Sequence, residues 1–314
     1  MFMPQRKVRH HYVWQEYLSP WTKDGSIYCR RTDGRIFKTG TPDIAVERLL
    51  YQLKIMSAQD ILIVRKMFVE PIVIPQLKTI AEGWLDTFLK AQSILQSTEN
   101  VDDLPQDLKK HLDAFEASFE EEIHTMVEHD ACKTLNRLRQ GDQTVFGDLN
   151  DMGGFCLFLG FQYIRTRKMA ANIERTLKDI QGFNVSASLG VIRVIVGWAI
   201  GANLLLYLEH NNWKVELLES QNDSEFITSD QPIINIEAIT ESKTPPTKFH
   251  IFFPLSPQLA TVIDFQSNHP GITSKEIASN EINDWNHKLF AESYEQVYAR
   301  SRDVLETLCA QEWS

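Results

Sequence analysis

Residues 155–164 read FCLFLGFQYI, a run in which Gln162 is the one strongly polar side chain. A surface helix shows polar residues every three or four positions, so this segment is expected to be buried on most sides. It forms the middle of a helix predicted over residues 148–180. A helix buried in this way requires other elements around it.

The chain on both sides of this run is predicted to be helical, from residue 58 to residue 211. In residues 106–139 the apolar side chains recur at steps of three, four, seven or eight, which gives one stripe along a long helix that Gly141 ends. Ser188 is the expected N-cap of a further helix. The predicted helices cover residues 58–68, 75–96, 106–139, 148–180 and 188–210.

Residues 189–208 are also apolar enough to be considered as a membrane span. Arg193 lies within this run, and a central arginine costs about 2.5–3.5 kcal/mol on insertion scales. We therefore interpret the run as a buried core helix, and we expect no membrane association.

Strand patterns occupy the two ends of the chain. Asp33-Gly34 separates two short strand-like runs and predicts a hairpin over residues 26–38. A short hairpin rarely survives alone, so it is expected to pair with the late strands. This predicts a single, mostly helical α+β domain over residues 1–314, with a helical middle (58–211) and β-containing ends (1–57 and 212–314) that pack together. The late elements predicted are strands 213–219, 225–228, 249–253 and 258–264 and a final helix over 274–308.

The composition excludes several classes of protein. The 314 residues carry a net charge of −10 with 43% hydrophobic residues, which excludes wholesale disorder and a uniformly basic phosphate-coating protein. Four dispersed cysteines and a polar N-terminus without an apolar signal region favour a cytoplasmic protein. The motifs GxGxxG, GxxxxGK[ST], GxSxG and HExxH are missing, which argues against dinucleotide enzymes, P-loop NTPases, α/β-hydrolases and zincins.

Candidate chemical groups include a histidine pair and a helix stripe. His10 and His11 would point to opposite faces of an extended segment, so one of them would line a given site as metal ligand or general base. Glu121, His124 and Glu128 share a stripe of the long helix, but Glu121-x-x-His124 lacks the second copy that a di-iron site requires. The alternatives are a surface or capping pair for the histidines and a solvated acidic flank for the helix stripe, with Glu128 the best single candidate.

Two further pairs are candidates. Gln162 and Arg165 lie one turn apart at the end of the apolar run, where Arg165 could hold a phosphate or a carboxylate. The alternative is a satisfied core pair, with a specific partner for Gln162 and with Arg165 bound to a buried carboxylate such as Glu128. Ser229 and Asp230 follow a strand, where Asp230 could bind a metal, orient a histidine or form an Asx turn before Pro232.

Together these segments resemble a bacterial family catalogued as domain of unknown function 4238. Its members open with a His-His-Tyr-Val/Ile-Pro-x-x-Tyr-Leu segment and a Gly-containing hairpin, and they carry a Glu-containing helix, Gln-x-x-Arg-Thr, Ser-Asp-x-Pro, Phe-Pro-Leu-Ser-Pro and a late Asn. The matching segments here are 10–18, 26–38, 128–138, 162–166, 226–232, 253–257 and Asn286, with Trp14 where the family usually has Pro. The resemblance implies a mostly helical α+β protein of bacterial or phage origin without a known activity. The resemblance suggests which residues belong together in one group: His10, His11, Gln15, Glu128, Gln162, Arg165, Ser229 and Asp230.

Two functions fit these residues. In the first, the protein hydrolyses a phosphodiester in a nucleic acid or nucleotide: His10, His11, Glu128 and Asp230 are catalytic, and Gln15, Gln162, Arg165 and Ser229 bind substrate at a local basic site, with a divalent metal ion as a possible cofactor. In the second, the protein is a non-catalytic interaction module of a defence or toxin system, and the polar groups form a closed buried scaffold. Converging His11, Glu128 and Asp230 side chains would favour the hydrolase, and complete pairing would favour the module.

Overall fold

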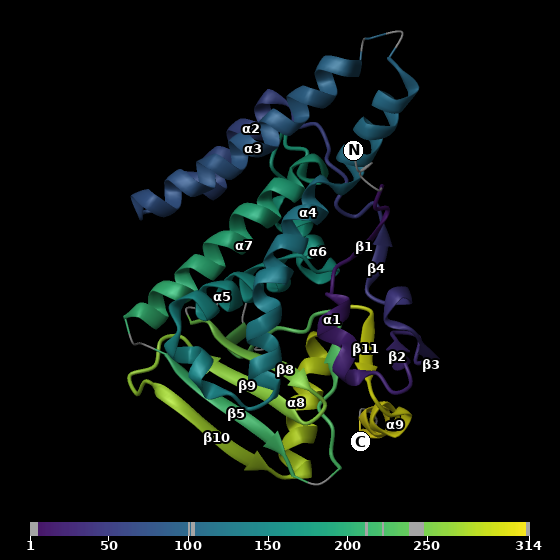
Figure 1. Cartoon of the computed structure of the whole chain (residues 1–314), viewed down its shortest axis with the longest axis vertical. Coiled ribbons are helices and arrows are strands. Elements are labelled where there is room, and N and C mark those ends of the chain that lie inside the picture. The colour runs from purple at the N-terminus through teal and green to yellow at the C-terminus, as the bar shows by residue number, and fades with distance from the viewer. Residues whose placement is uncertain are drawn as a thin grey trace.

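Helix α5 (Leu149–Ile164) lies at the centre of the computed structural model, which describes residues 6–99, 101, 104–210, 213–221, 223–238 and 248–311. The Asp148 carboxylate caps its N-terminus by accepting hydrogen bonds from the amides of Asn150 and Asp151. Ten of its residues are buried, so the prediction of a buried helix is confirmed. Its long neighbours are α4 (Gln106–Arg139) and α7 (Val185–Glu209), and α4 runs from the upper end of the molecule down to a sheet (Figure 1).

Glycines bring the backbones of α5 and α7 into direct contact. A Cβ atom on Gly160 would lie 2.2 Å from the carbonyl oxygen of Gly197, and one on Gly201 would lie 2.7 Å from the Cα of Leu157. No side chain larger than hydrogen fits between the two helices at these points. The contact explains why the most apolar segments of the chain, α5 and α7, are packed against each other.

Helix α7 has the length and hydropathy of a membrane span over Val185–Leu208, and half of its most apolar window is buried inside the structure. Arg193 is 2% exposed and pairs with Glu120 of α4. In the structure this helix packs against α5, α3 and α2. That packing is the core position expected from its arginine.

Two predictions about the helices are wrong. The predicted helix 148–180 is not a single element, because it breaks at Arg165. Thr166 takes an extended conformation (ψ 160°) and caps a separate helix with its hydroxyl group. The predicted Ser188 cap is also wrong, since Asn184 caps α7 and the buried Ser188 hydroxyl donates to the Asn184 carbonyl inside the helix.

The helices that surround α5 and α7 are short or lie at the edge of the core. They are α1 (Gln15–Leu18), α2 (Ala58–Val64), a π-turn (Arg65–Val69), α3 (Pro75–Glu99) and α6 (Arg167–Leu177).

A small antiparallel sheet joins the two ends of the chain, as predicted. Its strand order is β3 (Ile36–Thr39), β2 (Ile27–Arg31), β11 (Gln296–Ala299) and β6 (Thr228–Ser229). Helices take 56% and strands 18% of the structure, so the mostly helical α+β class is confirmed. Two further short strands, β1 (Arg9–His11) and β4 (Val46–Arg48), pair with each other.

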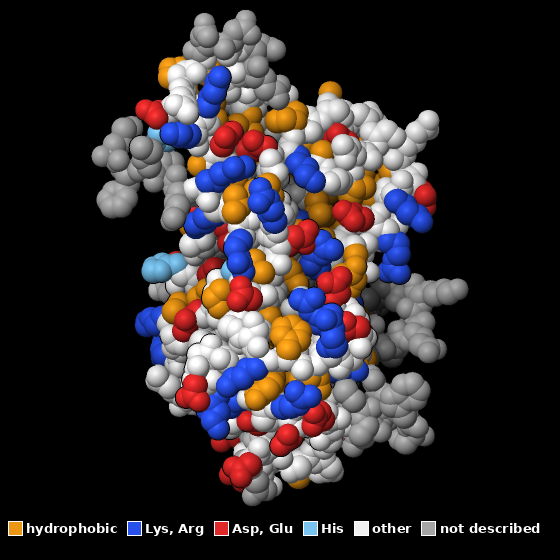
Figure 2. All heavy atoms as spheres, turned by 90° about the vertical axis from the view of Figure 1, so that its right-hand side faces the viewer, with side chains coloured by type: hydrophobic (Ala, Val, Ile, Leu, Met, Phe, Trp, Pro, Cys, Tyr) orange, Lys and Arg blue, Asp and Glu red, His pale blue; other side chains and the backbone are white. Residues whose placement is uncertain are grey.

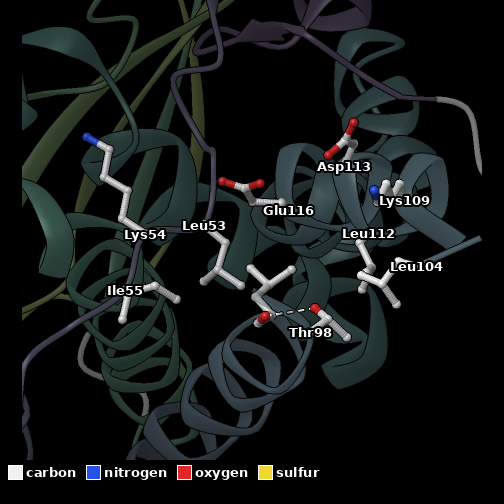
Figure 3. A pocket seen from close by; sticks show the side chains of 10 residues that line it. Leu53, Lys54, Ile55, Thr98, Leu104, Lys109, Leu112, Asp113 and Glu116 are labelled. Atoms are coloured by element: carbon white, nitrogen blue, oxygen red, sulfur yellow. Dashed lines mark hydrogen bonds between the residues drawn. The ribbon is translucent and has the colours of Figure 1, made fainter. Parts of the chain in front are cut away.

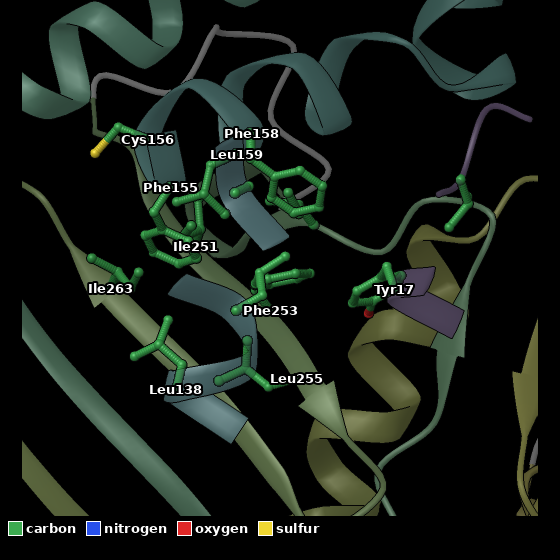
Figure 4. Close-up of a cluster of buried hydrophobic side chains, with 14 of the residues drawn as sticks. Tyr17, Leu138, Phe155, Cys156, Phe158, Leu159, Ile251, Phe253, Leu255 and Ile263 are labelled. Carbon is green, nitrogen blue, oxygen red and sulfur yellow. The ribbon is translucent and has the colours of Figure 1, made fainter. Parts of the chain in front are cut away.

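The late strands form a second sheet, in the order β10 (Gly271–Ile277), β5 (Lys214–Ser220), β9 (Leu259–Asp264), β8 (His250–Ser256) and β7 (Ile234–Asn235). Strand β8 is buried on both faces. Ile251, Phe253 and Leu255 pack against α4 and α5, as Figure 4 shows, and Phe252 stacks on Trp285 of α8 (Ser279–Glu292). Strand β8 is therefore enclosed between helices, whereas the edge strand β10 is exposed over Thr273–Glu276.

The predicted final helix over 274–308 is wrong. Residues 274–277 belong to strand β10, which pairs in parallel with β5, and the rest forms α8, β11 and α9 (Arg302–Gln311). The predicted strand 225–228 is reduced to β6. The Asn286 side chain accepts from the Ile227 amide at 2.9 Å and donates to the Glu225 carbonyl at 2.8 Å, so these backbone groups bond a side chain instead of a neighbouring strand.

We predict that Gly160→Ala destabilises the protein by about 3 kcal/mol or more, because a methyl group there forces α5 and α7 apart. The matched control is Gly153→Ala in the same helix, where the nearest atom to a new Cβ is 4.0 Å away. The control should be neutral or more stable, since alanine favours a helix over glycine. Urea unfolding of both variants measures the difference, and equal stabilities would contradict the close contact.

Candidate functional site

The two histidines of β1 face opposite ways, and His10 is fully buried. Its Nδ1 atom accepts a hydrogen bond from the Tyr51 amide at 2.8 Å, and its Nε2 atom lies 3.1 Å from the Lys7 carbonyl oxygen. The ring stacks on Tyr51, with centroids 5.4 Å apart. Burial lowers the pKa of His10, so its imidazole is neutral at pH 7 and both nitrogens are in use.

His11 is half-buried and contacts Gln15. Its Nε2 atom lies 3.2 Å from the Pro42 carbonyl oxygen, and its Nδ1 atom lies 3.1 Å from Nε2 of Gln15. Burial lowers the pKa of His11 as well. Gln15 thus fixes the orientation of the His11 ring, and both ring nitrogens of His11 have partners within the chain.

Gln162 binds the backbone of the N-terminal segment. Its Oε1 atom accepts from the Trp14 amide at 3.3 Å, and its Nε2 atom donates to the Tyr12 carbonyl at 2.9 Å. The side chain is 1% exposed. The expectation that this amide has a specific partner is confirmed, and the partner is main chain 150 residues away in the sequence.

Arg165 connects α5, α4 and the N-terminal segment. Its Nη1 atom donates to Glu128 Oε1 at 2.7 Å, and its Nη2 atom donates to the His11 carbonyl oxygen. Arg165 is 2% exposed and Glu128 14%. The ion pair expected between these two residues is confirmed, and both prongs of the guanidinium are occupied.

A second buried ion pair lies beside the first, and the sequence analysis missed it. Arg193 of α7 donates to Glu120 at 2.6 and 2.9 Å, and His124 Nε2 lies 3.3 Å from Glu120 Oε1. Burial would raise the pKa of Glu120, but Arg193 and His124 outweigh it and lower that pKa. Burial lowers the pKa of His124 to about 4. The signal for this pair was present in the sequence: a lone arginine within the apolar run of α7.

The ring of Tyr51 stands between the two ion pairs. Its centroid is 4.9 Å from the Arg193 guanidinium carbon, 5.9 Å from that of Arg165 and 4.6 Å from the His124 ring centroid. Its hydroxyl group donates to the Arg165 carbonyl at 3.2 Å. We call the group around this ring the Tyr51 cluster: His10, Tyr51, Glu120, Glu121, His124, Glu128, Arg165 and Arg193.

Glu121 is the member of the Tyr51 cluster whose pKa lies near neutral pH. Burial raises the pKa of Glu121 to about 7, with Arg165 lowering it and the neighbouring Glu128 raising it. Its Oε2 atom is buried without a hydrogen-bond partner, as are Nδ1 of His124, Nε of Arg165 and Nη1 of Arg193. A carboxyl group with this pKa can carry or release a proton near neutral pH.

Ser229 and Asp230 belong to a different segment. The Asp230 carboxylate accepts from the amides of Tyr294, Glu295 and Gln296 at 2.7–3.0 Å, and it thereby holds the turn that leads into β11. Burial raises its pKa to about 6, although these three N–H groups lower it. The Ser229 hydroxyl accepts from the Gln231 amide at 3.1 Å. The local turn bond is therefore made by Ser229, and the Asx turn that was the structural alternative for Asp230 is not what the carboxylate forms, since its amide partners lie 64–66 residues away.

The eight grouped residues therefore divide into two sets. His10, His11, Gln15, Glu128, Gln162 and Arg165 meet around the N-terminal segment, whereas Ser229 and Asp230 hold the turn before β11. The hydrogen bond of Thr166 to Gln231 links the sets. Within the described residues no three His, Cys, Asp or Glu side chains gather as a metal site would require.

We predict that Arg165→Met lowers the free energy of unfolding by about 3–5 kcal/mol, because it leaves the Glu128 carboxylate buried without its cation. Arg167→Met is the matched control: its pair with Glu47 is about one-third exposed, so its loss should cost about 0–1 kcal/mol. Adding Glu128→Leu to Arg165→Met should recover part of the loss. Denaturant unfolding of the four proteins tests this, and similar losses for both arginines would contradict the assignment.

The stability of the protein should depend on pH through Glu121. Folding raises the pKa of Glu121 from 4.5 to about 7, so the folded state favours the protonated carboxyl group. The wild type therefore loses stability as the pH rises from about 4.5 through about 7. Glu121→Gln removes this term and should be more stable than the wild type at pH 8 by up to about 3 kcal/mol, with little difference at pH 5.

Glu122→Gln, at the exposed neighbouring position, is the control and should follow the wild-type curve. The measurement is the urea midpoint from about pH 5 to 8 for the three proteins. Parallel curves for Glu121→Gln and the wild type would show that Glu121 does not titrate in this range.

The family model described as "Protein of unknown function (DUF4238)" matches residues 9–189 and 198–303. No curated protein and no solved structure matches the chain significantly. The matched ranges contain both polar sets and nearly all of the elements described above. The chain belongs to the DUF4238 family of proteins of unknown function.

Proposed function

We propose that this protein is a non-catalytic interaction module whose buried polar groups hold its own ends in place. The observation that carries the proposal is that the side chains of the eight grouped residues are bonded to other groups of the same chain. His10, Gln162, Arg165 and Asp230 are each at most 2% exposed and bonded to groups of the same chain. Substrate-binding residues normally present free donors or acceptors to a cleft, and these do not.

A phosphate would have to displace existing partners. The prongs of Arg165 are taken by Glu128 and the His11 carbonyl, and the Asp230 carboxylate is saturated by three amide donors. Replacing these bonds would leave a buried carboxylate without its cation and three amides without an acceptor. The same contacts explain why the N-terminal segment and β11 are fixed in position.

The surface offers places for binding at a distance from these groups. A hollow of about 470 Å³ opens where α3 and α4 diverge, and Figure 3 shows Leu53, Ile55, Leu112 and Glu116 around it. On the face drawn in Figure 2, basic and acidic side chains alternate with apolar ones between them. This pattern supports recognition of proteins better than recognition of a phosphate backbone.

The proposal includes a cytoplasmic location and a role in a bacterial defence or toxin system. Cys29, Cys132 and Cys156 are free thiols, which suits a reducing compartment. The defence or toxin system to which the protein contributes stays a prediction.

One observation favours hydrolysis of a phosphodiester or nucleotide as a second candidate. Glu121 combines a pKa near 7 with a buried, unpartnered oxygen beside Arg165, and this is how general acids and bases are set up in enzymes. Glu121, in place of His10 or Asp230, would then be the residue that moves the proton.

The two candidates are separated by a turnover assay. Purified protein is incubated with single-stranded DNA, double-stranded DNA, RNA and nucleoside triphosphates, each with Mg²⁺, Mn²⁺ or Zn²⁺. We expect no hydrolysis above that of a Glu121→Gln preparation purified in parallel. Because Glu121→Gln is expected to stay folded, turnover present in the wild type and lost in this variant would overturn the interaction module and establish the hydrolase.

A further inference from the structure

The N-terminal segment lies along α4 and is attached to it at two points. The Lys7 amide donates to Ser118 Oγ at 3.1 Å. Arg165, which binds Glu128, also donates to the His11 carbonyl oxygen. The distance from Ser118 to Glu128 is about 15 Å along the helix, and the extended chain from Lys7 to His11 covers about 13 Å. This segment therefore runs beside α4 for nearly three turns (Figure 1), and we call residues 7–11 the strap.

Glu121 lies on α4 between these two attachments. It follows Ser118 by three residues and precedes Glu128 by seven, so the three side chains share one side of the helix. The Lys7 charge is near enough to act on it. The Glu121 Oε2 atom is buried and has no hydrogen-bond partner. The strap therefore covers a carboxyl group that is shielded from water and only partly satisfied.

The strap is also bonded to the segment that contains β4. The Leu49 amide donates to the Val8 carbonyl oxygen at 2.9 Å, and the Tyr51 amide donates to His10 Nδ1 at 2.8 Å. Strand β1 itself pairs with β4. These amides lose their acceptors when the strap lifts, so their hydrogen exchange reports on its position.

The chain just beyond the strap is held by a different side chain. Gln162 donates to the Tyr12 carbonyl and accepts from the Trp14 amide. Neither bond involves α4 or Glu121, so both persist when the strap leaves α4. Residue 12 can therefore act as a hinge, which confines an opening to residues 7–11.

Arg165 is the group for which the strap and Glu121 would compete. Its Nη2 atom donates to the His11 carbonyl oxygen, and its Nε atom is buried without a partner. A carboxylate accepts more strongly from a guanidinium than a carbonyl oxygen does. Ionised Glu121 would therefore draw Arg165 away from His11, whereas protonated Glu121 would not.

Glu121 is the group beneath the strap whose charge changes near neutral pH. The charged groups that act on it are Arg165, Glu128, Lys7 and Glu120, and burial raises its pKa to about 7 against the opposing charges of Arg165 and Lys7. Arg193 is bound to Glu120. Burial lowers the pKa of each neighbouring histidine and raises that of the tyrosine, so these rings stay neutral from pH 7 to 8; they are His10, His11, His124 and Tyr51.

We propose that the strap is a pH-sensitive element: it lies on α4 while Glu121 is protonated, and ionisation of Glu121 shifts the equilibrium toward a form in which the strap has lifted about a hinge at Tyr12. Lifting brings water to the Glu121 carboxylate and leaves Arg165 free to pair with it. This inference goes beyond the proposed function and does not depend on it, since the opening requires neither a partner nor a substrate.

The test is hydrogen exchange of the full-length protein, measured by mass spectrometry at pH 5 and pH 8. Exchange in peptides that contain residues 7–11 and 46–51 is expressed as the ratio of the wild type to Glu121→Gln at the same pH, which cancels the intrinsic pH dependence and the titration of the histidines. We expect this ratio to rise by about tenfold or more from pH 5 to pH 8, because a tenfold change corresponds to one pKa unit between the attached and the lifted form.

Glu122→Gln is the matched control, since it makes the same change at the neighbouring exposed position, where the side chain pairs with Lys7. It should keep the pH response of the wild type. Repeating the measurement at pH 8 in urea up to about 1 M separates lifting from unfolding. Exchange of the strap should not change with urea, because a local opening exposes little surface, whereas exchange of the slowest α5 amides should accelerate.

Three results would overturn the proposal: a ratio that is equal at pH 5 and pH 8, a pH response that Glu122→Gln removes as fully as Glu121→Gln does, or strap amides that exchange with the same urea dependence as α5. The last result would show that the segment opens only when the whole protein unfolds. The turnover assay tests the proposed function separately, so either can fail without the other.

Discussion

The structure depends on one buried cation at the end of the central helix. Arg165 follows directly after α5 and binds Glu128 of α4 and the carbonyl of His11 at the same time. One turn earlier, Gln162 binds the backbone on either side of Val13. These two side chains tie the N-terminal segment to the helical core. Segments 148–154 residues apart in the sequence are thus fixed by three hydrogen bonds in the interior.

A buried ion pair of this kind is costly to form and damaging to break. Removing two charges from water costs several kcal/mol each, and their attraction compensates for that cost only when the geometry is good and the other polar atoms are bonded. The Tyr51 cluster contains two such pairs at bonding distances of 2.6–2.9 Å, arranged around one aromatic ring. The cluster is incomplete, because a carboxyl oxygen of Glu121, an imidazole nitrogen of His124 and one guanidinium nitrogen each of Arg165 and Arg193 are buried without a partner. Chemistry in this cluster would therefore depend on Glu121.

The helical arm, formed by α3 and the first half of α4, differs from this interior in its packing. At the lower end α4 contacts the five-stranded sheet, and Leu138 packs with Leu255 and Ile263 (Figure 4). In the upper part of the molecule α3 and α4 run at an angle to each other (Figure 1), and hollows open on two sides of α4, one of which is drawn in Figure 3. One long helix thus contributes to the enclosed core with its second half and borders open hollows with its first half.

Periodicity and composition were sufficient for much of the fold. The apolar run 155–164, the stripe of α4 and the Asp33-Gly34 hairpin each depend on neighbours within one or two turns, so a buried helix at 155–164, the long helix α4 and the hairpin were predicted correctly. That Gln162 would have a specific hydrogen-bond partner was predicted correctly, and a carboxylate partner for Arg165 was one of its two predicted alternatives, because a buried amide or guanidinium requires a partner. Tertiary contacts determined the rest: Thr166 ends α5 while bonded to Gln231, Asn286 takes the backbone bonds of residues 225–227, and Asp230 gathers the amides that start β11 where a helix was expected. Arg193 pairs with Glu120 across 73 residues. No local pattern encodes these bonds, because each joins groups that become neighbours only when the chain has folded.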